Sequence, residues 1–177
     1  LYSQAWFKKH LKSVSQAYSK TPHYDEIIQD YENLLTKEYR TIADLNITII
    51  VFLSRKMGVK TNFIRSSELE GIYGNKDDRL VKICCAVDAT GYLSARGSSV
   101  YIEEKSPGGA FRKSGINLYY HNFEHPQYPQ LGSSFLSHMS IIDLLMNCGY
   151  KHSLSIIQSG RREMIPYDQF RKIYCSS

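Results

Sequence analysis

The chain has 177 residues, of which 42% are hydrophobic and 22% charged, and its formal net charge is +5. This composition predicts one globular domain with a sizeable core, because the chain is too short for two such cores. No apolar run approaches the roughly 20 residues of a membrane span, and the start lacks a signal-peptide pattern. We therefore expect a single cytosolic domain over residues 1–177, without a membrane span.

The basic residues are scattered rather than gathered into one stripe, which argues against a nucleic-acid groove. Their densest clusters are Lys8-Lys9 with Lys12, and Arg161-Arg162. Both clusters are expected on solvated helix faces. A positive charge of this size is compatible with an anionic small substrate or an acidic partner protein.

Apolar spacing predicts that the first third of the chain is helical. A stripe of apolar residues at a four-three-four spacing indicates a first helix, capped by Ser3 and stopped by Pro22. A second helix is expected at about residues 25–37. A capping box that begins at Thr41 precedes a third helix, 45–57. Because this third helix is apolar on nearly all sides, we expect it to be packed between two layers.

Strands and helices are predicted to mix in the rest of the chain. The expected strands are 59–65, 92–95 and 116–123, and the expected helices are about 77–87, 137–147, 152–158 and 167–174. Strands joined by crossovers long enough for a helix usually pair in parallel. The prediction is thus an α/β fold with a small, mainly parallel sheet of about three strands flanked by several helices. Three strands are few for this many helices, so we expect the sheet to be incomplete at its N-terminal side.

The four cysteines show neither a metal-binding spacing nor a disulfide framework. They are Cys84, Cys85, Cys148 and Cys175. We expect reduced, mostly buried thiols. A covalent mechanism through Cys148 is an alternative, although a predicted position at the C-terminus of a helix raises the pKa of a thiol.

A polar segment with two prolines, residues 121–131, lies between a predicted strand and a predicted helix. Each proline fixes its own φ and restricts the residue before it, so His125, Tyr128 and Gln130 should be held in a defined arc. Such junctions are where α/β proteins often carry their chemistry. The alternative is a rigid connection whose histidines are only solvated.

Loops after consecutive parallel strands meet at one edge of a sheet. We expect three such loops to converge with the start of the later helix and to form a site. The Arg-Gly-Ser-Ser turn at 96–99 either lets backbone amides approach an anion or is only a tight turn. The binding candidates are Ser66, Ser67, Ser94, Arg96, Gly97, Tyr101, Tyr128, Gln130 and Asn147.

Blocks along essentially the whole chain resemble the WbqC-like family. They include Lys9-His10-Leu11-Lys12, Asp44-Leu45-Asn46, Ser66-Ser67, His125-Pro126, Tyr128-Pro129-Gln130 and, most specifically, Ser140-Ile141-Ile142-Asp143-Leu144-Leu145. Members of the family also carry an N-terminal block similar to His-Gln-Pro-x-Tyr-x-Pro-Trp, which does not occur in this sequence. The resemblance therefore implies that the chain corresponds to the C-terminal part of a member.

The family is bacterial and is associated with O-antigen and other surface-polysaccharide gene clusters. Its members are described as glycine or acyl transferases that modify an amino sugar. The resemblance implies that an amide forms between a carrier-protein or coenzyme A thioester and an amino-sugar or nucleotide-sugar substrate, with neither a tightly bound cofactor nor a metal. The alternatives are a noncatalytic module that binds a carrier protein or a nucleotide sugar, and a fragment without activity of its own.

Attack of an amine on a thioester requires a base for the amine proton and donors for the developing oxyanion. His125 is the first candidate for the base, and its alternative role is that of a structural histidine at a turn. His121 is the second candidate. Asp143, in an otherwise apolar helical run, either orients a histidine as in a catalytic triad or lies on the wet face of its helix.

Overall fold

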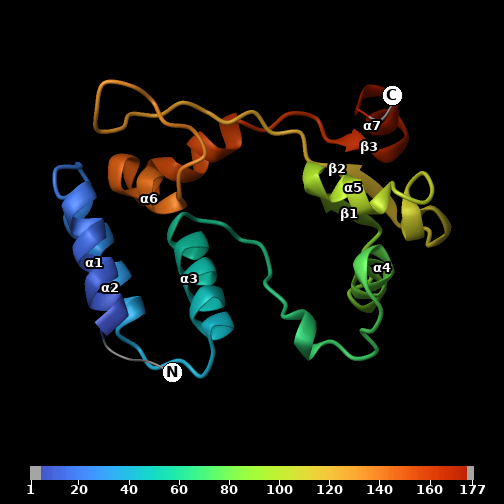
Figure 1. The fold of residues 1–177 in the computed structure, drawn as a ribbon, viewed down its shortest axis with the longest axis horizontal. Helices are drawn as coiled ribbons and strands as arrows, with labels where there is room; N and C mark the ends of the chain where they lie inside the picture. The colour runs from blue at the N-terminus through green and yellow to red at the C-terminus, as the bar shows by residue number, and fades with distance from the viewer. Residues whose placement is uncertain (1–4, 175–177) are drawn as a thin grey trace. The chain divides into compact units, whose positions relative to one another are not determined.

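The computed structural model describes residues 5–174, which form seven α-helices and one three-stranded sheet (Figure 1). The predicted α/β class is confirmed. The chain divides into two compact units. The helical unit comprises residues up to 62 together with 125–160, and the sheet unit comprises residues 63–124 together with 161 onward. The prediction of one domain over residues 1–177 stays a prediction.

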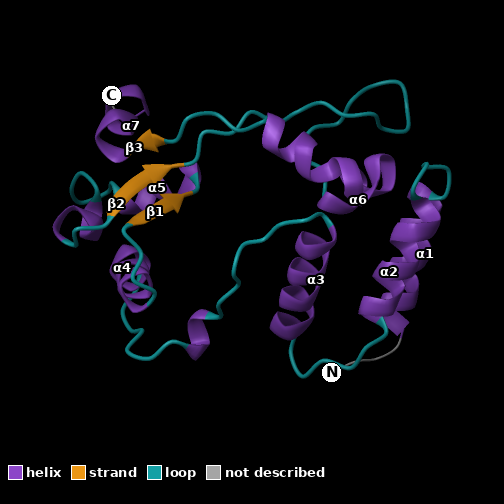
Figure 2. Ribbon diagram, turned by 180° about the vertical axis from the view of Figure 1, so that it is seen from behind, coloured by secondary structure: helices purple, strands orange, loops and turns teal. Residues whose placement is uncertain are grey.

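Four helices build the helical unit. They are α1 (Ala5–Tyr18), α2 (Tyr24–Leu35), α3 (Ile42–Lys56) and α6 (Ile141–Ser159). Helices α1 and α2 lie side by side, and α6 lies across the ends of α2 and α3 (Figures 1 and 2). Ile27, Leu53, Leu145 and Met146 form the centre of this packing, and each is at most 4% exposed. The expected cap Ser3 lies outside the described residues.

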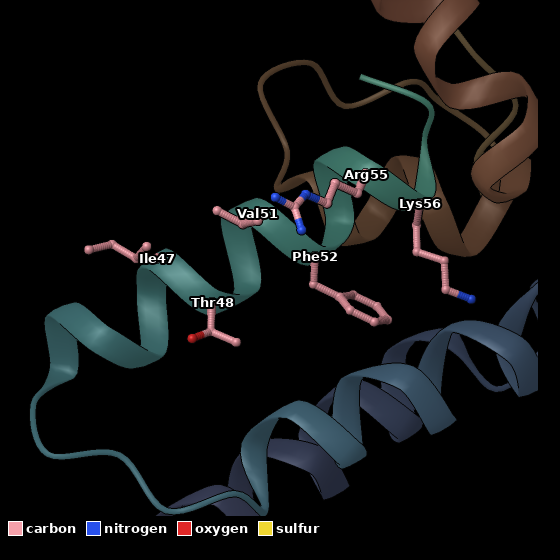
Figure 3. A pocket seen from close by; sticks show the side chains of 6 residues that line it. All are labelled: Ile47, Thr48, Val51, Phe52, Arg55 and Lys56. Atoms are coloured by element: carbon pink, nitrogen blue, oxygen red, sulfur yellow. The ribbon is translucent and has the colours of Figure 1, made fainter. Parts of the chain in front are cut away.

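Helix α3 begins as its capping box predicts, because the Thr41 hydroxyl accepts a hydrogen bond from the Asp44 amide at 3.1 Å. The prediction that α3 is packed between two layers is wrong, since Ile50 is 55% exposed. A hollow of about 560 Å³ lies along this helix. Figure 3 shows Phe52 on the side of α1 and α2, and Val51 on the opposite side. The helix therefore packs along one stripe only.

Helix α6 begins later than predicted and is broken in its middle. Ser140, rather than Ser137, caps it by accepting a hydrogen bond from the Ile142 amide at 3.3 Å. The break at Gly149 confirms the predicted helix end there, because its φ of +67° is in the left-handed region. A Cβ at this position would lie 2.7 Å from the His23 ring, so both the conformation and the close packing require glycine.

Parallel strands β1 (Gly91–Ser94) and β2 (Asn117–Tyr120) form the centre of the sheet unit, and the short strand β3 (Ile165–Pro166) pairs antiparallel with β2 (Figure 2). The crossover between β1 and β2 contains the one-turn helix α5 (Ser99–Ile102) and two 3₁₀ turns. Helices α4 (Lys76–Ala86) and α7 (Tyr167–Tyr174) complete the unit.

The predicted strand 59–65 is wrong. This segment is extended and mostly exposed, and within the described part of the chain it pairs with no other strand. An extended segment becomes a strand only if a neighbour satisfies its backbone groups. The third strand is instead β3, which has two residues and therefore no detectable alternation. Cys84 is buried as expected, but Cys85 is exposed.

One face of the sheet is covered and the other is open. Leu118 and Tyr120 point into a core that Phe111 and Phe170 complete, and all four are at most 3% exposed. Leu93, on the opposite face, is 50% exposed. None of the helices among residues 5–174 has the length and apolarity that crossing a membrane requires.

A buried carboxylate anchors this core, which makes a stability test possible. Glu103 is 8% exposed and accepts hydrogen bonds from the Tyr120 hydroxyl at 2.7 Å and the Gly108 amide at 2.9 Å. We expect Tyr120→Phe to lower the free energy of unfolding by about 1.5–3 kcal/mol, because a buried charge loses a donor. Urea denaturation of the full chain measures this change.

The neighbouring residue provides the matched control. The hydroxyl of Tyr119 makes no hydrogen bond among the described residues. Tyr119→Phe should therefore change the free energy of unfolding by less than about 0.5 kcal/mol. Equal losses in the two variants would show that the hydroxyl of Tyr120 does not support the Glu103 carboxylate.

Candidate functional site

The residues predicted to form the site are divided between the two units. Ser66, Ser67, Ser94, Arg96, Gly97, Tyr101 and His121 belong to the sheet unit, and His125, Tyr128, Gln130, Asp143 and Asn147 belong to the helical unit. Each unit brings some of its own candidates into contact, and the two groups are described in turn.

A buried carboxylate collects most of the candidates in the helical unit. Asp143 is 6% exposed, and its Oδ2 accepts hydrogen bonds from the Tyr128 hydroxyl at 2.8 Å and from Gln130 Nε2 at 2.7 Å. Tyr18 on α1 also interacts with this carboxylate. Asn147 lies one turn further along α6 and donates its amide to the Asp143 carbonyl at 2.8 Å. We call Tyr18, Tyr128, Gln130 and Asp143 the carboxylate cluster.

The partners of Asp143 are neutral donors, and no histidine among residues 5–174 donates to it. The expected orientation of a histidine by Asp143 is therefore not seen in the described part of the chain. Donors supply the compensation that a buried carboxylate needs. The cluster ties the segment that contains Tyr128 and Gln130 to helix α6, and a catalytic role for Asp143 stays a prediction.

Gln130 also closes the loop that follows it. Its Oε1 accepts from the Leu136 amide at 2.8 Å, and its Nε2 donates to the Leu136 carbonyl at 3.0 Å. The side chain thus behaves like the backbone of a neighbouring strand. One glutamine holds both this loop and the Asp143 carboxylate.

His125 is held by backbone groups at both ring nitrogens. Nδ1 lies 3.0 Å from the Pro126 carbonyl oxygen, which can only accept, so Nδ1 carries the proton. Nε2 then has the free electron pair, and it accepts from the backbone amide of His138 at 3.2 Å. These contacts fit the structural role that was the alternative for His125. Acting as a base would require Nε2 to release the His138 amide.

Cys148 is buried in the helical unit beside the carboxylate cluster. Burial raises the pKa of its thiol, and the negative charge of Asp143 raises it further. The thiolate is the nucleophilic form of cysteine. The environment of Cys148 therefore works against the covalent mechanism.

The C-terminal ends of β1 and β2 bring three of the candidates in the sheet unit together. The amide of His121 donates to the Ser94 carbonyl at 2.8 Å, and Arg96 Nε donates to the His121 carbonyl at 3.2 Å. A second nitrogen of Arg96 donates to the Asn122 side chain. These contacts confirm that the two loops after the parallel strands meet at one edge of the sheet.

Other candidates lie away from this edge. Ser66 and Ser67 are exposed in a 3₁₀ turn, and they do not line the hollows at the strand ends. The reason is that the segment before them never joins the sheet. Tyr101 packs against the core on the covered face of the sheet. Gly97 belongs to the 3₁₀ turn that follows β1.

Two hollows adjoin at the sheet edge and share Leu93 and His121. The smaller, of about 350 Å³, is also lined by Arg96, and the larger, of about 1040 Å³, is also lined by Arg161 and Arg162. We call the two hollows together the sheet-edge groove. The two adjacent arginines were expected on a helix face. Instead, the backbone of Arg161 forms an isolated antiparallel β-bridge with that of Phe123. Such a long-range pairing leaves no local signal in the sequence.

His121 presents an open imidazole in this groove. Its ring stacks on that of Phe123, with centroids 5.6 Å apart and planes at 24°. Among residues 5–174 its ring nitrogens form no hydrogen bond. Of the two candidates for the base, His121 is thus the one whose ring nitrogens have no partner within the described chain. No group of three or more His, Cys, Asp or Glu side chains in the described chain could hold a metal ion.

Fold and sites together define an α/β protein with a buried, hydrogen-bonded carboxylate in one unit and a cationic groove at the sheet edge of the other. Residues 1–154 match the WbqC-like protein family, so the chain belongs to this family, as its sequence blocks predicted. It is similar to the uncharacterized protein Rv1507c of Mycobacterium tuberculosis (strain ATCC 25618 / H37Rv), with 27% identity over 146 residues.

That alignment covers 81% of this chain and 61% of the mycobacterial protein, so the chain spans less than two thirds of this relative. No solved structure gives a significant match. The comparisons thus establish the family of this chain. The name of the mycobacterial relative assigns no activity to that relative.

The carboxylate cluster predicts a loss of stability at alkaline pH. Burial, together with the hydrogen bond to Asp143, raises the pKa of Tyr128 from 10.0 to about 12. The unfolded chain therefore releases this proton at a lower pH than the folded chain. The stabilisation is fully present below pH 10 and is lost as the pH rises through about 12.

Tyr128→Phe should remove the contribution of Tyr128 to this dependence and leave that of Tyr18, whose pKa is also raised to about 12. We expect a loss of about 1.5 kcal/mol below pH 10, because the Asp143 carboxylate loses one donor. Between pH 10 and about 12 the stability of the variant should fall less steeply than that of the wild type. Urea denaturation across this range measures both effects, and parallel curves for the two proteins would contradict the assignment.

Cysteine alkylation tests the environment of Cys148. At neutral pH, iodoacetamide should modify the exposed Cys85 at least about tenfold faster than the buried Cys148, whose raised pKa leaves little thiolate. Peptide mass spectrometry over a time course gives both rates. Faster modification of Cys148 would support its role as a nucleophile, and Cys148→Ala would then be expected to abolish activity.

Proposed function

We propose that the chain transfers an acyl or glycyl group to the amine of an amino sugar during synthesis of a bacterial surface polysaccharide. Membership of the WbqC-like family supports the reaction class. The observation that carries the proposal is the open imidazole of His121 in the sheet-edge groove. The donor in this proposal is a thioester of a carrier protein or of coenzyme A.

In the proposed reaction the amine nitrogen attacks the thioester carbonyl carbon. His121 accepts the proton that the amine loses as the C–N bond forms. The C–S bond then breaks, and the protonated imidazole returns the proton to the departing thiolate. The positive charge of the arginines that line this groove stabilises the negative charge that develops on the carbonyl oxygen. No covalent intermediate with the protein is needed.

The carboxylate cluster has a supporting role in this proposal. It fixes the segment that contains Tyr128 and Gln130 to α6 through the buried Asp143. It does not supply the base, because Asp143 is enclosed by donors and His125 is held by backbone groups. The chemistry is therefore assigned to the sheet unit.

The test is transfer by the purified full chain from a panel of coenzyme A and carrier-protein thioesters to nucleotide-linked amino sugars. Mass spectrometry detects the gain of the acyl group. His121→Gln, which retains polarity but not basicity, should lower the rate by about 10²-fold or more, the usual contribution of a general base.

His152→Gln is the matched control, because His152 is exposed on α6 in the helical unit. Its rate should stay within about twofold of the wild type, as expected for a surface substitution. Equal rates for wild type and His121→Gln would remove His121 as the base. Binding of a nucleotide sugar without transfer from any thioester would instead support a noncatalytic binding module.

A further inference from the structure

Three arginines line the sheet-edge groove, and two of them form no salt bridge within residues 5–174. Arg162 pairs with Glu124 at 2.5 Å. In the part of the chain that the structure describes, neither Arg96 nor Arg161 forms a salt bridge. Glu163 also lines the groove, so the wall is not uniformly basic. The unpaired positive charge is concentrated at Arg96 and Arg161.

The guanidinium of Arg96 is held in place while most of its donors stay free. It donates to the His121 carbonyl and to the Asn122 side chain, and it lies over the Tyr174 ring at 5.3 Å from the centroid. Arginine has five N–H donors, so these two hydrogen bonds leave about three for a ligand. A guanidinium that is already fixed loses little conformational freedom when it binds an anion, so the entropic cost of binding phosphate is low.

Arg161 stands close to the same place from another segment. It bridges the chain at Phe123, and Phe123 lines the smaller hollow together with Arg96. The larger hollow continues past Arg161 to Tyr174 on α7. The groove thus combines two unpaired guanidinium groups with an aromatic ring and a volume of about 1040 Å³ in its larger part. That volume exceeds the need of a single inorganic phosphate.

We propose that the sheet-edge groove binds the pyrophosphate group of a substrate between Arg96 and Arg161, with the attached organic group along the larger hollow towards Tyr174. Planar guanidinium groups match phosphate oxygens in two-point hydrogen bonds. This inference deepens the proposed function and rests on it for the role of the ligand as a substrate. The pyrophosphate could belong to a nucleotide-linked acceptor or to a coenzyme A donor.

Binding is measured by isothermal titration calorimetry of the full chain, without turnover. Uridine diphosphate and coenzyme A are the two pyrophosphate probes; their matched controls without pyrophosphate are uridine, and pantetheine together with adenosine 3′-phosphate. We expect at least one pyrophosphate probe to bind at least about tenfold more tightly than its matched compound, as for a hydrogen bond to a charged group. Binding of uridine diphosphate indicates the acceptor side, and binding of coenzyme A indicates the donor side.

The double variant Arg96→Gln with Arg161→Gln should bind the same probe at least about tenfold more weakly. The control is Arg112→Gln, an exposed arginine of the sheet unit that does not line this groove. Its affinity should stay within about twofold of the wild type. Circular dichroism checks that each variant is folded.

Several results would overturn the inference. They are the absence of binding by both pyrophosphate probes at millimolar concentration, equal binding of the compounds without pyrophosphate, undiminished binding by the double variant, and equal loss of binding in Arg112→Gln. The proposed function fails separately. Intact pyrophosphate binding without acyl transfer would remove only the transferase activity, whereas transfer without pyrophosphate binding would remove only this assignment of the groove.

Discussion

Each unit depends on one interaction, a hydrogen bond from a tyrosine hydroxyl to a buried carboxylate. In the helical unit Asp143 accepts from Tyr128, and in the sheet unit Glu103 accepts from Tyr120. A buried charge is costly unless donors surround it. Each carboxylate also has a partner from a segment distant in sequence, Tyr18 for Asp143 and Arg171 for Glu103, so all its partners are in place only when its unit is assembled. These polar contacts specify the arrangement that the apolar cores stabilise.

This construction separates rigidity from chemistry. The polar groups of the carboxylate cluster and of His125 are saturated by partners within the protein. At the sheet edge, by contrast, His121 and two arginines face a hollow with unused hydrogen-bonding capacity. Saturated groups hold a structure, and unsaturated groups in a groove are available to a ligand. The second arrangement is therefore the better candidate for function in this WbqC-like protein.

The sequence predicted the α/β class, most helices, both parallel strands and the meeting of their loops, because these follow from local periodicity and a general rule of parallel sheets. It did not predict that residues 59–65 lack a strand partner or that 165–166 form one, since pairing is decided over long distances. The same limit applies to Arg161, whose position depends on its bridge to Phe123. The rigid neighbours of His125 favour it over His121 as the base, but the sequence does not reveal which ring nitrogens already have hydrogen-bond partners.

The division of the chain has a consequence for folding. Each unit is assembled from two separate stretches of sequence, and the chain passes between the units after residues 62, 124 and 160. The sheet unit completes its sheet only with β3 at Ile165–Pro166, and the helical unit closes only with α6. Contacts of such large sequence separation slow folding. During synthesis on the ribosome, both units should therefore remain incomplete until residues beyond 140 have emerged, which leaves their apolar surfaces exposed to chaperones.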